Sequence, residues 1–228
     1  MTLPPRSSDP SLELNYSRWL PTDRNAAILD LGCGNGRVLR FLSTRGYCRL
    51  RGVDRDSKAL SSIGDLAGVT LDCNEVNADY LRRQKGAFKL IILRQVIYYI
   101  ERRDVYDFMV SLKDALADDG VLIIEFFNAA LLSSRLTEMK DPFIRTAYSE
   151  HSIRRLFDAC GLDTHYIGPD RSSARGLRST VYAQLRAAWV KILNAIYILE
   201  RGFDDELPRI YTKSIIAVAG KVPDRLPL

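Results

Sequence analysis

The stretch that decides the fold runs from Ile28 to Gly36 and reads ILDLGCGNG. Residues 26–31 are mostly apolar and predict a short buried β-strand. The three glycines that follow alternate with single residues, so the backbone can turn sharply and a ligand can approach without meeting a Cβ atom. Residues 37–44 carry apolar side chains at helical spacing, and the start of such a helix offers free N–H groups. Strand, glycine loop and helix together predict a binding site at one end of a sheet.

Working outward from this loop, short apolar runs alternate with helical patterns along most of the chain. The alternation predicts an α/β fold with a mostly parallel sheet covered by helices on both faces. Gly120 and Gly161 are predicted to end the helices that precede them. The predicted strands are 26–31, 49–54, 69–76, 88–93, 121–127, 162–167 and 211–220. The predicted helices are 12–20, 37–44, 57–65, 104–117, 150–159 and 181–201.

The chain is expected to form a single domain over residues 12–228, after a loose Pro- and Ser-containing segment at residues 1–11. Two long connections, at about 128–150 and 171–209, are predicted as inserts. The helix in the second insert has an apolar stripe at helical spacing, formed by Leu185, Trp189, Ile192, Ile196 and Leu199. We expect this stripe to pack on the core, with a lid, a dimer contact or a membrane-facing surface as alternatives.

Composition narrows the functional classes without choosing among them. The net charge of +5 is modest, so a solvated basic face explains it better than a nucleic-acid interface does. The chain has four cysteines, none in a CxxC pair, and two histidines, so no zinc site is predicted. Single cysteines, together with a first segment that lacks a signal-peptide core, indicate a cytoplasmic protein. Polar residues within 181–199 argue against a membrane span.

The spacing of the glycines distinguishes between two classes of cofactor-binding site. Dinucleotide sites have the pattern G-x-G-x-x-G and hold a pyrophosphate at the helix start. Here the pattern is G-x-G-x-G, and Asp30 lies two residues before the first glycine. A carboxylate there would repel a phosphate and suits a ligand with a positive charge. A nicotinamide-dependent oxidoreductase is therefore disfavoured.

Residues 28–42, ILDLGCGNGRVLRFL, resemble the first motif of class I S-adenosylmethionine (SAM)-dependent methyltransferases, and the resemblance extends over roughly residues 26–168. It implies a Rossmann-like seven-stranded sheet whose last strand is antiparallel. It implies SAM as cofactor, S-adenosylhomocysteine as product, and no metal. Asp54 matches the acid that holds the ribose, and Asp79 matches the one that accepts from adenine, with Tyr80 beside the base. The expected cofactor-binding residues are Asp30, Gly32, Cys33, Gly34, Asn35, Gly36, Asp54, Arg55, Asp79, Tyr80, Arg94 and Gln95.

The segment after the fourth predicted strand departs from the family. Small-molecule methyltransferases often have Glu and His where this chain has Tyr98 and Tyr99, so the familiar candidate base is missing. The Asp/Asn-Pro-Pro-aromatic run of amino-group methyltransferases that act on nucleic acids is also missing. We expect Tyr98, Tyr99 and His151 to be the catalytic candidates. Tyr98, Tyr99, Asn128 and Tyr148 are expected to contact the acceptor, whereas His165 is expected to be structural.

The predicted function is methyl transfer from SAM to a small-molecule acceptor, with a hydroxyl of a sugar or of a surface-glycan precursor as one candidate. Residues 210–221 and the preceding helix resemble the C-terminal part of bacterial methyltransferases linked to surface polysaccharides. Two alternatives remain: a SAM-binding regulatory or scaffolding protein without catalysis, and an RNA methyltransferase. Nucleic acid is the less favoured partner, because no RNA-binding domain is visible. The oligomeric state is open, with a homodimer as one option.

Overall fold

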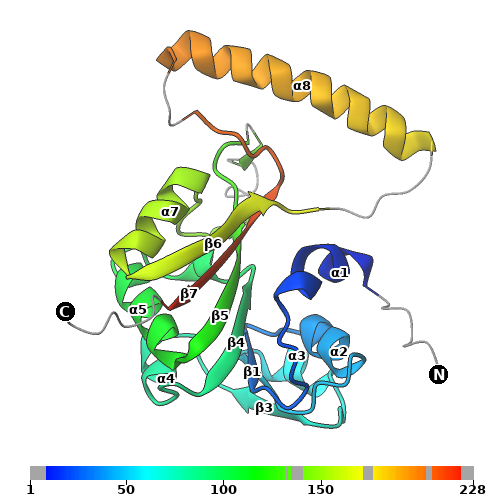
Figure 1. Ribbon diagram of the computed structural model, residues 1–228, viewed down its shortest axis with the longest axis vertical. Helices are drawn as coiled ribbons and strands as arrows, with labels where there is room; N and C mark the ends of the chain where they lie inside the picture. The colour runs from blue at the N-terminus through cyan, green and yellow to red at the C-terminus, as the bar shows by residue number, and fades with distance from the viewer. Residues whose placement is uncertain (1–8, 132, 135–140, 172–176, 204–206, 222–228) are drawn as a thin grey trace.

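The computed structural model describes residues 9–131, 133–134, 141–171, 177–203 and 207–221. Its centre is a seven-stranded sheet with the order β3-β2-β1-β4-β5-β7-β6 (Figure 1). The first five strands are parallel, and β7 pairs antiparallel with both β5 and β6. The strands are β1 (Ile28–Leu31), β2 (Leu50–Asp54), β3 (Val69–Cys73), β4 (Phe88–Arg94), β5 (Leu116–Phe127), β6 (Leu162–Pro169) and β7 (Ser214–Lys221). The predicted mostly parallel sheet with an antiparallel last strand is confirmed.

Helices cover both faces of the sheet, as predicted. One face carries α1 (Pro10–Tyr16), α2 (Arg37–Ser43) and α3 (Ser57–Ser61), and the other carries α4 (Ala78–Arg82), α5 (Val105–Ala115) and α7 (Glu150–Ala159) (Figure 1). Each face has its own buried apolar cluster. Strands β1, β4, β5 and β7 send buried side chains into both clusters, which explains why their sequences are almost continuously apolar.

Residues 9–11 of the predicted loose segment 1–11 belong to the start of a helix. Residues 1–8 lie outside the described residues, but α1 begins at Pro10. The Asp9 side chain caps this helix by accepting from the Leu12 N–H at 3.2 Å, and Pro10 occupies the first helical position. Asp9 also accepts from Arg37 Nε at 2.5 Å, which ties the start of α1 to the first turn of α2.

Gly120 does not end a helix, so that prediction is wrong. Helix α5 ends at Ala115, and the chain turns directly into β5 because Leu116 is already extended, with ψ of 141°. Gly120 lies within β5, where an added Cβ would come within 2.9 Å of the carbonyl oxygens of Ala117 and Phe88. The pairing of β4 with β5 changes register at this point. The glycine is needed there for close strand contact. Gly161, with φ of 65°, does follow α7 as predicted.

The long helix α8 (Leu177–Arg201) does not pack its apolar stripe on the core, contrary to expectation. It stands apart from the sheet, beyond the end at which the parallel strands finish (Figure 1). A different side of the helix faces the body, where Leu193 is buried and Tyr197 donates to the Ala130 carbonyl at 2.9 Å. Helical periodicity identified the stripe correctly, but it could not show which side meets the rest of the chain.

Gly32 fixes how closely the glycine loop approaches the segment after β4. Its φ is 80°, and a Cβ added there would lie 2.2 Å from Cγ2 of Val96. The Val96 methyl cannot swing away easily, because a β-branched side chain is stiff at χ1. Glycine is therefore required at position 32 both for its backbone angle and for space.

We expect Gly32→Ala to lower the free energy of unfolding by about 3 kcal/mol, since strain at positive φ and steric overlap add. Gly46→Ala is the matched control: its φ is 82°, but nothing lies within 4 Å of an added Cβ. It should cost only about 1 kcal/mol. Urea denaturation of both variants measures the difference. Equal losses would contradict the steric account, as would failure of Val96→Ala to relieve the Gly32→Ala variant.

Candidate functional site

A cavity of about 460 Å³ opens where the parallel strands β1, β2, β3 and β4 end. Ligands of open α/β sheets bind at this edge, because the loops that leave neighbouring strands converge there. The glycine loop forms one wall, and the segment after β4 forms the other. The lining residues are Asp30, Gly32, Cys33, Gly34, Asn35, Arg37, Val38, Asp54, Arg55, Glu75, Val76, Arg94, Gln95, Val96, Tyr99 and Ile100.

Asp30 is the most unusual ionisable group in this cavity. Its side chain is 1% exposed, and its Oδ2 atom is buried without a hydrogen-bond partner among the described residues. The pKa of the Asp30 carboxyl is raised to about 7, mainly by burial; the Arg94 guanidinium opposes this rise, and the nearby Asp54 carboxylate adds to it. A buried carboxylate without a partner is costly. A cation in the cavity would supply the missing partner.

Asp54 joins the glycine loop to the end of β2. Its Oδ2 accepts from the Gly34 N–H at 2.7 Å, and its Oδ1 accepts from the Asp56 N–H at 2.9 Å. A carboxylate has about four acceptor positions, so both oxygens can take further hydrogen bonds from a ligand. Gly34 itself has φ of 50° and nothing within 4 Å of an added Cβ, so that position faces open space. This pair of residues can therefore hold a hydroxyl-bearing group against the loop.

Glu125 of β5 organises the wall opposite the loop. It is buried, and it accepts from Arg94 Nε at 2.9 Å and from Gln95 Nε2 at 2.9 Å. Gln95 has φ of 58°, an angle that non-glycine residues seldom adopt, and its bond to Glu125 helps to hold that strained turn. The Tyr16 hydroxyl of α1 lies 3.5 Å from the same carboxylate. The end of β4 is thus fixed by one acid on the neighbouring strand.

Most of the predicted cofactor residues meet in this cavity, but three do not line it. Gly36 begins α2 and lies against Ile63. Asp79 lies in the first turn of α4, where its side chain is 80% exposed and pairs with Arg82 at 2.5 Å. Tyr80 is buried and donates to Asp72 at 2.7 Å. The chain turns into α4 only after Glu75 and Val76, so these two residues occupy the place expected for Asp79 and Tyr80.

The acceptor-side candidates are also dispersed, and only Tyr99 lines the cavity. Tyr98 packs beside Tyr99, with ring centroids 4.7 Å apart, and against Phe127. Tyr99 is 41% exposed, and its hydroxyl donates to Asp141 Oδ2 at 2.8 Å. The Arg145 N–H donates to the Tyr98 carbonyl at 2.7 Å. The insert after β5 therefore meets Tyr98 and Tyr99 through residues 141–145.

Asn128, Tyr148 and His151 lie away from this cavity. Asn128 is fully buried and donates to the carbonyls of Ile210 and Thr212, so it ties the insert to the approach of β7. Tyr148 is buried against Phe126, and burial raises its pKa to about 12. His151 opens α7 and lines a separate hollow with Arg154. None of the three lines the cavity, and neither does any residue of α8 whose side chain the structure describes.

Sequence reasoning missed six lining residues: Arg37, Val38, Glu75, Val76, Val96 and Ile100. These residues could have been predicted in principle, because each lies in a segment that follows the glycine loop or the end of a strand. Glu125 was visible as the one charged residue in an apolar strand, but its link to Arg94 and Gln95 depends on strand pairing. The Arg37–Asp9 bond could not be foreseen, since the two residues are joined only by the tertiary fold.

The residues present fit a cofactor that is cationic at one end and carries hydroxyls. The unpartnered Asp30 oxygen suits the cationic group, and the Asp54 carboxylate with the open position at Gly34 suits a diol. Among the described residues, no group of three or more His, Cys, Asp or Glu side chains could hold a metal ion. No helix in the described part of the chain is long and apolar enough to cross a membrane.

Comparison with solved structures supports the same fold. An Archaeoglobus fulgidus SAM-dependent methyltransferase aligns with a TM-score of 0.62 and 14% identity, covering 86% of each chain. A Mesorhizobium loti SAM-dependent methyltransferase aligns with a TM-score of 0.61 and 16% identity, covering 88% of this chain and 93% of the other. A search of curated protein sequences gave no match.

A sequence profile of the family described as "Methyltransferase domain" matches residues 10–167, more than half of the chain. The match spans the glycine loop, Asp54 and the segment after β4, which are the parts that build the cavity. The chain therefore belongs to the class I SAM-dependent methyltransferases, and its cofactor is S-adenosylmethionine.

Proposed function

We propose that SAM lies along the cavity from Asp30 to Glu75. Asp54 accepts hydrogen bonds from the ribose hydroxyls, while Glu75 and Val76 flank the adenine after β3. Asp30 faces the cationic methionine end, and Arg94 and Gln95 shape the wall beside it. What supports this arrangement is the order of the lining residues along the sheet edge, together with the unpartnered Asp30 oxygen.

For the acceptor, we propose a small molecule that is methylated on a hydroxyl, with a sugar or surface-glycan precursor as the favoured class. The observation that carries this proposal is Tyr99, which lines the cavity and whose partly exposed phenol donates to the Asp141 carboxylate behind it. A hydroxyl acceptor must lose its proton, and a carboxylate reached through a hydroxyl can take it. The resemblance of the C-terminal part to polysaccharide-linked methyltransferases supports the sugar class.

The chemistry assigned to the chain is positioning and proton transfer. SAM supplies a methyl group on a positively charged sulfur, which leaves as a neutral thioether. Tyr99 remains protonated at neutral pH, because burial and the hydrogen bond to Asp141 raise its pKa above the ordinary value of 10. The acceptor hydroxyl bonds to the Tyr99 oxygen, and its proton passes to Asp141 directly or through that phenol. With SAM bound, the acceptor oxygen would take the methyl group as the methyl–sulfur bond breaks, so the reaction would balance without a further reactant.

Asp30 predicts how SAM affinity depends on pH. With a folded-state pKa of about 7, the carboxyl is protonated below that value and cannot pair with a cation. A cationic ligand binds the ionised form, so affinity should rise by up to about tenfold per pH unit below pH 7 and level off above it. Calorimetry at pH 6 should also show that about one proton is released on binding.

The matched variant for this prediction is Asp30→Asn, which keeps the shape and removes the charge. It should bind SAM weakly and with no pH dependence between about pH 5.5 and 7.5. An unchanged, flat affinity profile in the wild-type protein would show that Asp30 does not face the cationic group.

Asp54→Ala should weaken SAM binding by about 10- to 150-fold, because a hydrogen bond to a charged group is worth roughly 1.5–3 kcal/mol. Asp56→Ala is the control. Asp56 caps α3 by accepting from the N–H groups of Lys58 and Ala59, and it does not line the cavity. It should lower stability by about 1 kcal/mol and leave SAM affinity intact. Similar SAM affinity in the two variants would refute the role given to Asp54.

The acceptor proposal is tested first by incubating the protein with labelled SAM and a panel of sugars, nucleotide sugars, small amines and RNA. Transfer to a sugar hydroxyl is the expected result. Label found only on amines or on RNA would overturn the proposed acceptor class. Cofactor binding without transfer to any member, in a panel that includes glycan precursors, would favour a non-catalytic SAM-binding protein.

With an acceptor from that panel, Tyr99→Phe and Asp141→Asn should each lower turnover by about 100-fold while SAM affinity changes little. Tyr148→Phe is the control, since it removes a buried hydroxyl that has no partner among the described residues and lies outside the cavity. Its turnover should equal that of the wild type. Undiminished turnover in both the Tyr99 and Asp141 variants would place the acceptor proton elsewhere.

A further inference from the structure

Helix α8 carries the largest group of exposed apolar side chains in the described chain. Six of them lie on this helix: Val181, Leu185, Trp189, Ile192, Ile196 and Leu199, between 38% and 86% exposed. Phe203, just beyond the helix, is more exposed still. A single exposed leucine needs no explanation, but a continuous apolar face on one helix indicates an interaction surface.

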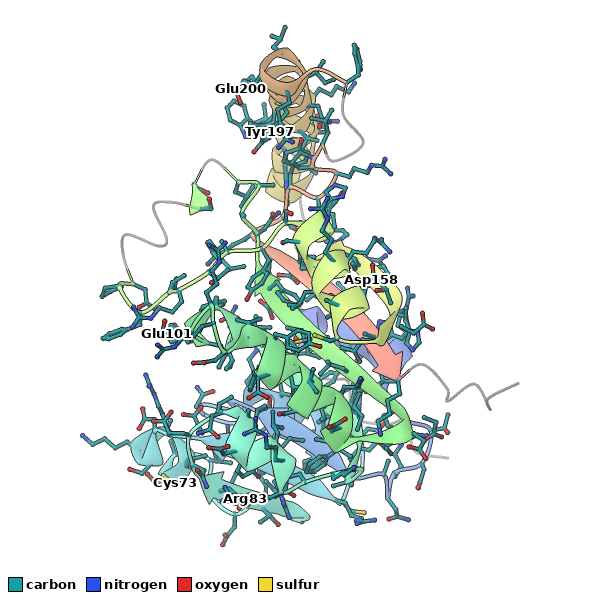
Figure 2. All side chains as sticks on the ribbon, turned by 90° about the vertical axis from the view of Figure 1, so that its left-hand side faces the viewer. Cys73, Arg83, Glu101, Asp158, Tyr197 and Glu200 are labelled. Atoms are coloured by element: carbon teal, nitrogen blue, oxygen red, sulfur yellow. The ribbon has the colours of Figure 1, made fainter. Side chains whose placement is uncertain are left out.

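The helix is attached to the body by a different side. Leu193 is buried, Arg186 donates to the Tyr211 carbonyl at 3.0 Å, and Asn194 accepts from the Tyr211 hydroxyl at 2.5 Å. In Figure 2, Tyr197 and Glu200 mark α8, which stands clear above α7 and the sheet. The orientation of α8 is therefore set by polar contacts and one buried leucine, and these leave the apolar face turned outward.

The spacing of the apolar face matches a second helix. From Leu185 through Trp189, Ile192 and Ile196 to Leu199, the intervals are four, three, four and three residues. This alternation, a mean period of 3.5 residues, is the seam along which two helices interlock side chains. Small residues, Ala188 and Ala195, flank the seam on one side and let a partner helix approach closely.

The exposed area is also that of a dimer interface. Large apolar side chains present roughly 150–250 Å² when fully accessible, so the five seam residues expose roughly 500 Å², and Val181 and Phe203 beyond the ends of the seam raise the total to roughly 800 Å². That is about what each partner contributes to a specific protein–protein interface. A self-complementary seam on one helix fits the twofold symmetry of most homo-oligomers.

We propose that α8 pairs with α8 of a second copy of this chain, forming a two-helix seam along residues 185–199. A lipid surface is the less favoured occupant, because helices that lie on membranes carry many Lys and Arg residues on their polar side. Between residues 183 and 199, α8 has only Arg186 and Lys191, and Arg186 is bound to a backbone carbonyl. The pairing lies outside the cofactor cavity and does not depend on the acceptor proposed above.

The test is the oligomeric state of the full chain at micromolar concentration, measured by sedimentation equilibrium. The wild type is expected to be a dimer, and Ile192→Glu should weaken association by more than about 100-fold, because it buries a charge in the seam. Lys191→Glu is the matched control: it changes a neighbouring residue that is not in the seam and should remain dimeric. All three proteins should bind SAM equally, which shows that Ile192→Glu has folded.

Tryptophan fluorescence tests the dimer without relying on the Ile192→Glu variant. In a Trp19→Phe background, Trp189 is the only tryptophan, and its emission should shift to the red on dilution as the dimer separates. A wild-type protein that is monomeric at all concentrations overturns the proposal. So does a dimer that survives Ile192→Glu. A monomer that co-sediments with phosphatidylglycerol vesicles would assign the face to lipid instead.

Discussion

The burial of one carboxylate, that of Asp30, is the constraint around which the cofactor site is built. The fold places it near the end of β1, beside the glycine loop, where Asp30 is almost fully buried and its Oδ2 atom finds no protein donor among the described residues. Stability does not explain why this carboxylate lies in an apolar sheet, since an unpaired buried charge destabilises the folded chain. In the proposed arrangement, the cationic end of the cofactor supplies the compensating charge.

The residues around Asp30 include one that stabilises its ionised form and others that hold the cavity walls in place. Arg94 lowers the cost of ionising Asp30, and Glu125 in turn fixes Arg94 and Gln95. Asp54 holds the glycine loop through the Gly34 N–H. The Arg94–Glu125 ion pair joins β4 to β5, and the Asp54–Gly34 hydrogen bond joins the end of β2 to the glycine loop. The proposed acceptor side depends instead on the insert after β5, which reaches Tyr98 and Tyr99 through residues 141–145. In that proposal, substrate choice can vary with the insert while the contacts on the cofactor side are kept.

The sequence alone predicted those features that depend on local pattern. Apolar runs and the glycine loop identified the parallel strands, and strand order then placed Asp30, Asp54 and Arg94 at one edge. The failures involve contacts between distant segments. Asp79 has the right residue type just after β3, but the turn into α4 carries it to the surface. Asn128 follows β5 and Tyr148 precedes α7, but their side chains point into the protein: Asn128 donates to the Ile210 carbonyl, and Tyr148 packs on Phe126. The outward face of α8 could not be predicted, because the sequence does not show which side of the helix contacts Tyr211.

The most direct test of this account is a carboxyl NMR titration that follows the Asp30 side chain in the free protein and in the complex with SAM. The account predicts a pKa of about 7 in the free protein, caused by burial, and a fall by two or more pH units when the cation binds. A pKa near 4 in the free protein, or a value that SAM leaves unchanged, would contradict the claim that this buried carboxylate is held for the cofactor.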